Sequence, residues 1–182
     1  MPIFTGYTTP RYQIHDVLIS KLVTDFNQNK SIYIGVEVTK NIPDLTESLV
    51  KSWIIQESGG NDPRSRQAWI VDPAQVNVPG DWSVYKQSIG LESPIKRNEG
   101  KVEQNLKAAI MWLARKGFGK SGQPVSNRSA ATFDGWKVAF QRYNGRTVIT
   151  NNGKSYNTNY SDRIIERSSQ PAKHVPIELP KP

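Results

Sequence analysis

Apolar residues recur at helical spacing along much of the chain, and the pattern is clearest between residues 45 and 60. Four of them fall on one face of the expected helix: Leu45, Leu49, Trp53 and Ile54. Asp44 or Thr46 is suited to cap its start, and the pair Gly59-Gly60 predicts that a residue in left-handed conformation ends it. This segment is the expected centre of the fold.

The same spacing predicts further helices at residues 17–27, 101–117 and 133–143, and a last one at about 160–168. Residues 31–39 alternate between apolar and other positions, which predicts a strand. Its apolar side would carry Ile32, Ile34, Val36 and Val38. Residues 61–100 are rich in Pro, Gly, Asn, Asp and Ser, so we expect a long loop-rich or small β segment there. The fold class is therefore mainly α, a helical bundle around the helix at 45–60.

The 182 residues suffice for one well-packed domain with short additions. We place the domain at residues 43–168. Residues 1–42 are interpreted as an N-terminal extension that precedes the domain or packs on it. Residues 169–182 contain closely spaced prolines and are interpreted as an extended tail.

The net charge of +8 favours an anionic partner, either a nucleic acid or an acidic polymer such as bacterial cell wall. The chain has no dense Lys/Arg helix and no aromatic-basic RNA signature, so we expect no nucleic-acid partner. With no Cys and two His, it offers neither thiol chemistry nor a zinc site, and we expect no metal and no cofactor. No apolar run is long enough for membrane insertion, and the first residues lack the pattern of a Sec signal peptide.

Glu57 is the main candidate for chemistry. It lies at the C-terminal end of the helix at 45–60, where the helix dipole is negative and the neighbours are apolar. Both effects raise the pKa of a carboxyl group, as a general acid requires. The alternative is a solvated glutamate that happens to precede a Gly-Gly turn.

Four separated pieces resemble the soluble lytic transglycosylase group of the lysozyme-like superfamily. They read Glu57-Ser58-Gly59-Gly60, Asp72-Pro73-Ala74-Gln75, Glu103-Gln104-Asn105-Leu106 and Tyr143-Asn144-Gly145, and Tyr160 with Ile164 resembles the start of that family's closing helix. The second piece departs from the family pattern, because only its glutamine is kept and Asp72 stands where the family has glycine. The resemblance covers about residues 43–168 and implies an α+β lysozyme-like domain that needs no cofactor.

The resemblance implies that the chain cleaves the β-1,4 bond between N-acetylmuramic acid and N-acetylglucosamine in peptidoglycan, with Glu57 as general acid. A lytic transglycosylase needs no second carboxylate, whereas a hydrolase needs a base that positions water. Asp72 is the first candidate for this base, ahead of Asp62 and Asp81. The candidate substrate-binding residues are Ser58, Gln75, Asn105 and Tyr143, together with Trp69 and Trp82, which lie in the loop-rich segment and are suited to stack on sugars. Trp53, Trp112 and Trp136 are assigned to the core.

Two other functions stay open. One is a chitinase-like hydrolase of N-acetylglucosamine polymers, and the other is a non-catalytic module that binds the cell wall. If peptidoglycan is the substrate, the protein acts in the bacterial periplasm and reaches it through a secretion system or a phage, or as part of a longer protein. An antibacterial effector of this kind would have an immunity protein as partner.

Overall fold

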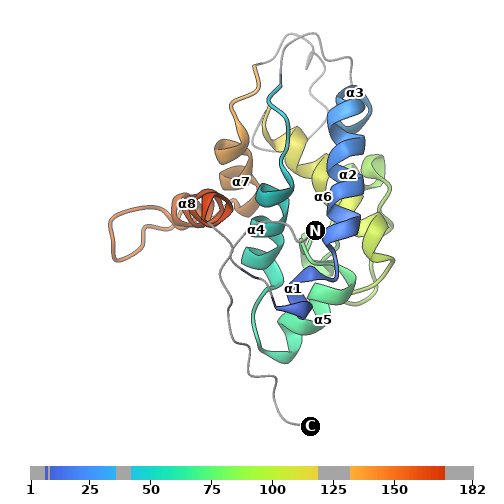
Figure 1. Ribbon diagram of the computed structural model, residues 1–182, viewed down its shortest axis with the longest axis horizontal. Helices are drawn as coiled ribbons and strands as arrows, with labels where there is room; N and C mark the ends of the chain where they lie inside the picture. The colour runs from blue at the N-terminus through green and yellow to red at the C-terminus, as the bar shows by residue number, and fades with distance from the viewer. Residues whose placement is uncertain (1–6, 8, 36–41, 119–131, 171–182) are drawn as a thin grey trace.

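The computed structural model describes residues 7, 9–35, 42–118 and 132–170. These residues are mainly helical, and Figure 1 shows their arrangement. The α-helices are α1 (Pro10–Gln13), α2 (Asp16–Gln28), α3 (Lys30–Ile34), α4 (Glu47–Ser58), α5 (Pro63–Val71), α6 (Val102–Lys116), α7 (Trp136–Asn144) and α8 (Tyr156–Ser169); two 3₁₀ turns span Pro79–Asp81 and Val84–Ile89. No helix among the described residues is both long and apolar enough to cross a membrane.

Helix α4 lies near the middle of the bundle in the view of Figure 1 and packs against α8, α2 and α5. Thr46 caps its start, because its side-chain oxygen accepts a hydrogen bond from the Leu49 amide at 3.2 Å. The predicted left-handed end is wrong, since Gly59 has a φ of −73°. Glycine is nevertheless required there, because a Cβ atom would lie 2.5 Å from the carbonyl oxygen of Ile55.

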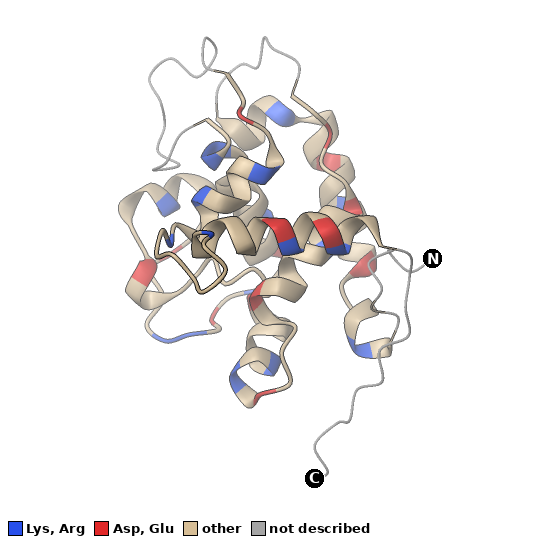
Figure 2. Ribbon diagram, turned by 90° about the vertical axis from the view of Figure 1, so that its left-hand side faces the viewer, with Lys and Arg blue, Asp and Glu red and all other residues tan. Residues whose placement is uncertain are grey.

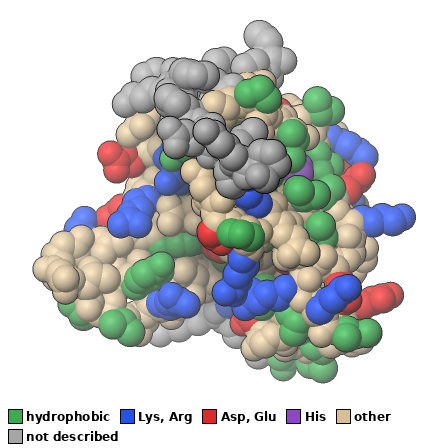
Figure 3. All heavy atoms as spheres, turned by 90° about the horizontal axis from the view of Figure 1, so that it is seen from below, with side chains coloured by type: hydrophobic (Ala, Val, Ile, Leu, Met, Phe, Trp, Pro, Cys, Tyr) green, Lys and Arg blue, Asp and Glu red, His purple; other side chains and the backbone are tan. Residues whose placement is uncertain are grey.

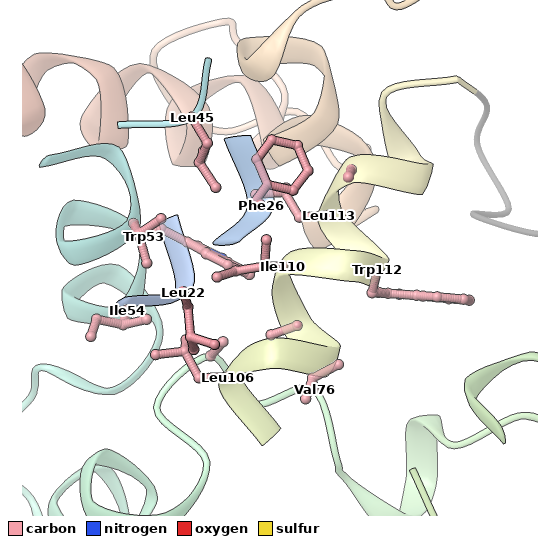
Figure 4. Packing of buried hydrophobic residues seen from close by; sticks show 14 of the residues in the cluster. Leu22, Phe26, Leu45, Trp53, Ile54, Val76, Leu106, Ile110, Trp112 and Leu113 are labelled. Carbon is pink, nitrogen blue, oxygen red and sulfur yellow. The ribbon is translucent and has the colours of Figure 1, made fainter. Parts of the chain in front are cut away.

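One continuous core joins the helices on both sides of α4, and Figure 4 shows its centre. Trp53 of α4 and Phe26 of α2 are fully buried in it. Lys51 of α4 and Asp16 of α2 form a buried ion pair, with 2.8 Å between Nζ and Oδ1. Helix α2 therefore belongs to the same core as residues 43–168. The predicted core positions Trp53, Trp112 and Trp136 are confirmed, all three being buried.

The predicted strand at residues 31–39 is wrong where the structure describes it. Residues Lys30–Ile34 form the short helix α3, and Gly35 ends this helix at a φ of 82°. The helical twist buries Ile34 completely and leaves Ile32 67% exposed, so the two side chains do not share a side. The expected strand positions Val36 and Val38 lie outside the described residues, as does most of the proline-rich tail.

The loop-rich segment at residues 61–100 contains one helix, α5, which the sequence analysis did not predict. Asp62 caps it, with its carboxylate accepting hydrogen bonds from the Ser65 amide at 3.0 Å and the Ser65 hydroxyl at 2.6 Å. Pro63 occupies the first turn, where a missing N–H costs nothing. The rest of the segment holds the two 3₁₀ turns, and no regular strand occurs among the described residues of this segment.

Candidate active site

Helix α4 delivers Glu57 to the wall of a cavity of about 370 Å³, which we call the central lobe. Helix α8 fixes this end of α4. The Ser52 hydroxyl donates a hydrogen bond to the carbonyl of Ile164 at 2.8 Å, and the Arg167 guanidinium donates to the carbonyl of Ser52 at 3.0 Å. Because these two bonds tie the backbones of the two helices together, the position of Glu57 relative to α8 is well defined.

Two tyrosines surround the carboxyl group. Tyr160 of α8 donates its hydroxyl hydrogen to Oε1 of Glu57. Tyr143 of α7 also lines the central lobe, donates to the carbonyl of Ala74 at 2.8 Å and packs edge-on against Trp53. Burial and the nearby Glu57 raise the pKa of both tyrosines well above its ordinary value, so both hydroxyls keep their protons and act as donors.

The pKa of Glu57 is raised to about 7, and burial is the main cause. The hydrogen bond from Tyr160 opposes this rise because it stabilises the ionised form. The negative charges of Asp72 and Asp81 raise the pKa further, and the positive charge of Arg146 lowers it. A carboxyl with this pKa is partly protonated at neutral pH, which suits a group that gives and retakes a proton.

The central lobe continues into a second cavity on each side. A cavity of about 460 Å³, the hairpin lobe, shares Gln56, Tyr156 and Tyr160 with the central lobe. A cavity of about 350 Å³, the α5 lobe, shares Arg64 and Gln75 with it. The two outer lobes share no lining residue, so the central lobe lies between them. Glu57 therefore lies at the middle of a three-lobed groove.

Arginines line all parts of the groove: Arg64, Arg97, Arg146 and Arg163. Figure 3 shows Lys and Arg side chains gathered across the face seen from below. Among the described residues, no carboxylate forms an ion pair with any of these four guanidinium groups. The groove is thus suited to a ligand that carries negative charges.

The structure does not bring Asp72 to the groove. Its side chain is 1% exposed, and its two oxygens accept hydrogen bonds from the amides of Val76 at 3.1 Å and Asn77 at 2.8 Å. Burial raises its pKa, although these two bonds oppose the rise. Asp72 shapes the loop that follows α5, and a water molecule has no access to it. The prediction that it is the catalytic base is therefore wrong.

Ser58 and Asn105 do not line the groove either, and their side chains donate hydrogen bonds to backbone carbonyls instead. The Ser58 hydroxyl donates to the carbonyl of Pro73 at 2.7 Å. The Asn105 amide donates to the carbonyls of Val71 and Glu99, both at 2.9 Å. Each side chain is 1% exposed, so neither contacts a ligand in the groove. The prediction that they bind substrate is wrong, because their polar atoms form hydrogen bonds that connect α4 and α6 to neighbouring segments.

Gln75 and Tyr143 do line the central lobe, as predicted. Gln75 donates a hydrogen bond to the carbonyl of Glu57 and has a φ of 51°, which turns the chain towards the groove.

The two loop tryptophans do not line the three lobes. Trp69 is 1% exposed, and its indole N–H donates to the carbonyl of Arg11 at 3.1 Å, so its predicted stacking on sugars is wrong. Trp82 is only partly exposed and its indole nitrogen is buried.

Asp81 is an acidic residue that lines the central lobe together with Glu57, and its side chain is 79% exposed. The buried ammonium of Lys86 lies 3.0 Å from Oδ2 of Asp81 and donates to the carbonyl of Val76 at 2.8 Å. This anchored lysine holds the Asp81 carboxylate at the groove. The described residues contain no group of three acidic or histidine side chains suited to hold a metal ion.

Searches against protein-family models, curated proteins and solved structures find no match to this chain.

Proposed function

We propose that this protein cleaves the β-1,4 bond between N-acetylmuramic acid and N-acetylglucosamine in peptidoglycan, as a lytic transglycosylase or a muramidase. The observation that carries the proposal is the Glu57 carboxyl, whose pKa is about 7, at the middle of a groove that continues on both sides. An acid so placed has room for sugars on either side of the bond it protonates. The arginines of the groove, which form no ion pair with a carboxylate among the described residues, match a glycan that bears carboxylates. Chitin is neutral and bears none.

The first step is a proton transfer from Glu57 to the oxygen of the glycosidic bond. Tyr160 donates to Oε1, so the proton to be transferred resides on Oε2. As the C–O bond breaks, both electrons of the bond go to the leaving sugar oxygen, and an oxocarbenium-like centre develops at C1. The ionised Glu57 is then stabilised by Tyr160 and by the positive charge of Arg146.

Two second steps are compatible with this site. In hydrolysis, Asp81 is the base that takes a proton from a water molecule as its oxygen attacks C1. In transglycosylation, the C6 hydroxyl of the muramic sugar attacks C1, and Glu57 takes back a proton from it. Hydrolysis gives a reducing end, whereas transglycosylation gives a 1,6-anhydro end.

Mass spectrometry of digested sacculi tests both the function and the step. Glu57→Gln should abolish cleavage, while Glu103→Gln is the matched control, because Glu103 is exposed and pairs with Lys21 away from the groove. Full activity of Glu57→Gln, or no activity of the wild-type protein on sacculi, would refute the proposal.

Asp81→Asn distinguishes the two second steps. Reducing ends that disappear in this variant identify Asp81 as the base, and anhydro ends made at an unchanged rate identify a transglycosylase.

A further inference from the structure

One part of the wall of the hairpin lobe is polar and already organised. Residues between α7 and α8 form a hairpin that projects from the bundle (Figure 1), closed by a bridge between Ile149 and Ser155. On its inner side, the Asn152 amide donates to Oδ1 of Asn159 at 2.9 Å, and the Asn159 amide donates to the Thr150 hydroxyl at 2.7 Å. These bonds fix the amide groups before any ligand arrives, which lowers the entropic cost of binding.

Arg163 supplies the charge of this lobe. It lies on α8, where acidic and basic positions follow each other closely (Figure 2). Its acidic neighbour Asp162 is already occupied, because Lys137 lies 2.6 Å and Lys154 lies 2.9 Å from its carboxylate oxygens. No carboxylate among the described residues pairs with Arg163, so its guanidinium is available to a ligand.

The tyrosines of the hairpin lobe also take part in other contacts, since the Arg146 guanidinium lies 5.2 Å from the ring centre of Tyr156 and the Tyr160 hydroxyl is bonded to Glu57. Beside these rings, the wall of the lobe carries amide groups and the Arg163 guanidinium. Amides match peptide or acetamido groups, and a guanidinium matches a carboxylate through two parallel hydrogen bonds.

We propose that the hairpin lobe binds a carboxylate-bearing substituent of the glycan, next to the bond that Glu57 protonates. Arg163 holds the carboxylate, and Asn151 and Gln56 contact the adjoining amide. The proposal rests on the proposed function and adds a specificity site to it. Two groups of peptidoglycan have this chemistry, the stem peptide and the lactyl group that remains when the peptide is removed.

Binding to the intact but inactive chain tests this site. Glu57→Gln is titrated by calorimetry with soluble glycan strands that carry stem peptides, and with the same strands after their carboxylates are converted to amides. We expect Arg163→Ala, added to Glu57→Gln, to weaken binding of the native strands roughly 10- to 100-fold. It should leave the weaker binding of the amidated strands unchanged. Lys101→Ala is the control, because it removes an exposed charge that does not line the groove.

Equal affinity for native and amidated strands, or an equal effect of Lys101→Ala, would overturn the specificity site and leave the proposed function intact. No binding of any glycan strand would overturn both. Strands whose peptides an amidase has removed carry the freed lactyl carboxylate in place of the peptide carboxylates. Retained dependence on Arg163 shows that the site also accepts the lactyl group, and lost dependence assigns it to the stem peptide alone.

Discussion

The raised pKa of Glu57 predicts that its ionised carboxyl group destabilises the folded protein at alkaline pH. The pKa is 4.5 in a solvated chain and about 7 in the folded protein. Each pKa unit corresponds to about 1.4 kcal/mol, so full ionisation in the folded state costs at most roughly 3 kcal/mol. Glu57 is partly exposed, and water screens part of this cost, so we expect about 1–3 kcal/mol.

The sign follows from proton binding. Between pH 4.5 and about 7 the folded state holds a proton on Glu57 that the unfolded chain has lost. The folded state therefore loses stability as pH rises through this window. Glu57→Gln removes the titration and keeps a side-chain oxygen that accepts the hydrogen bond from Tyr160.

Urea unfolding of both proteins at pH 4 and pH 8 measures this effect. We expect the free energies of unfolding to be similar at pH 4, and the variant to be more stable by about 1–3 kcal/mol at pH 8. Glu103→Gln controls for the loss of an exposed carboxylate. A difference in the free energy of unfolding between wild type and Glu57→Gln that is the same at both pH values would refute the reasoning. A wild-type protein that is more stable than Glu57→Gln at pH 8 would refute it as well.

Three further predictions concern catalysis and the core. The kcat/KM for glycan cleavage should fall as pH rises through about 7, because Glu57 loses the proton that it must donate; a profile flat to pH 9 would contradict this. Tyr160→Phe removes a hydrogen bond that lowers the pKa of Glu57, so the fall in kcat/KM should move to higher pH. A fall at the same pH or at lower pH would argue against the contact. Lys51→Met breaks the buried pair with Asp16 and should cost about 3–5 kcal/mol in thermal or chemical unfolding, whereas Lys21→Met, at an exposed pair, should leave the stability nearly unchanged.

The sequence predicts the helices whose apolar faces are wide. The expected helix at 101–117 is observed at Val102–Lys116, and the one at 17–27 is observed at Asp16–Gln28. Helix α5 escapes this reasoning because only Ala68 and Trp69 are buried along it. Two buried positions give no readable period, and the Asp-Pro pair that starts the helix also starts turns.

The sequence predicts a site residue only where the residues around it in a single segment determine its environment. Glu57 follows from its place at the end of a periodic helix, within that one segment. Asp72 lies three residues before the groove residue Gln75 in one motif, yet its carboxylate is directed to backbone amides, which no pattern of residue types reveals. The arginines of the groove look like ordinary solvated charges in the sequence, and only the fold shows that no carboxylate among the described residues pairs with them.

The hydrogen bond between Tyr160 and Glu57 joins residues 103 positions apart, and the Ser52 and Arg167 contacts join even more distant segments. Such contacts close large loops, which is slow compared with the formation of a helix. During synthesis, Glu57 leaves the ribosome long before its tyrosine partner exists. A chain interrupted before α8 would contain Glu57 but lack the side of the hairpin lobe that α8 supplies. The complete groove is thus a property that the chain acquires only once nearly all of α8 has been made.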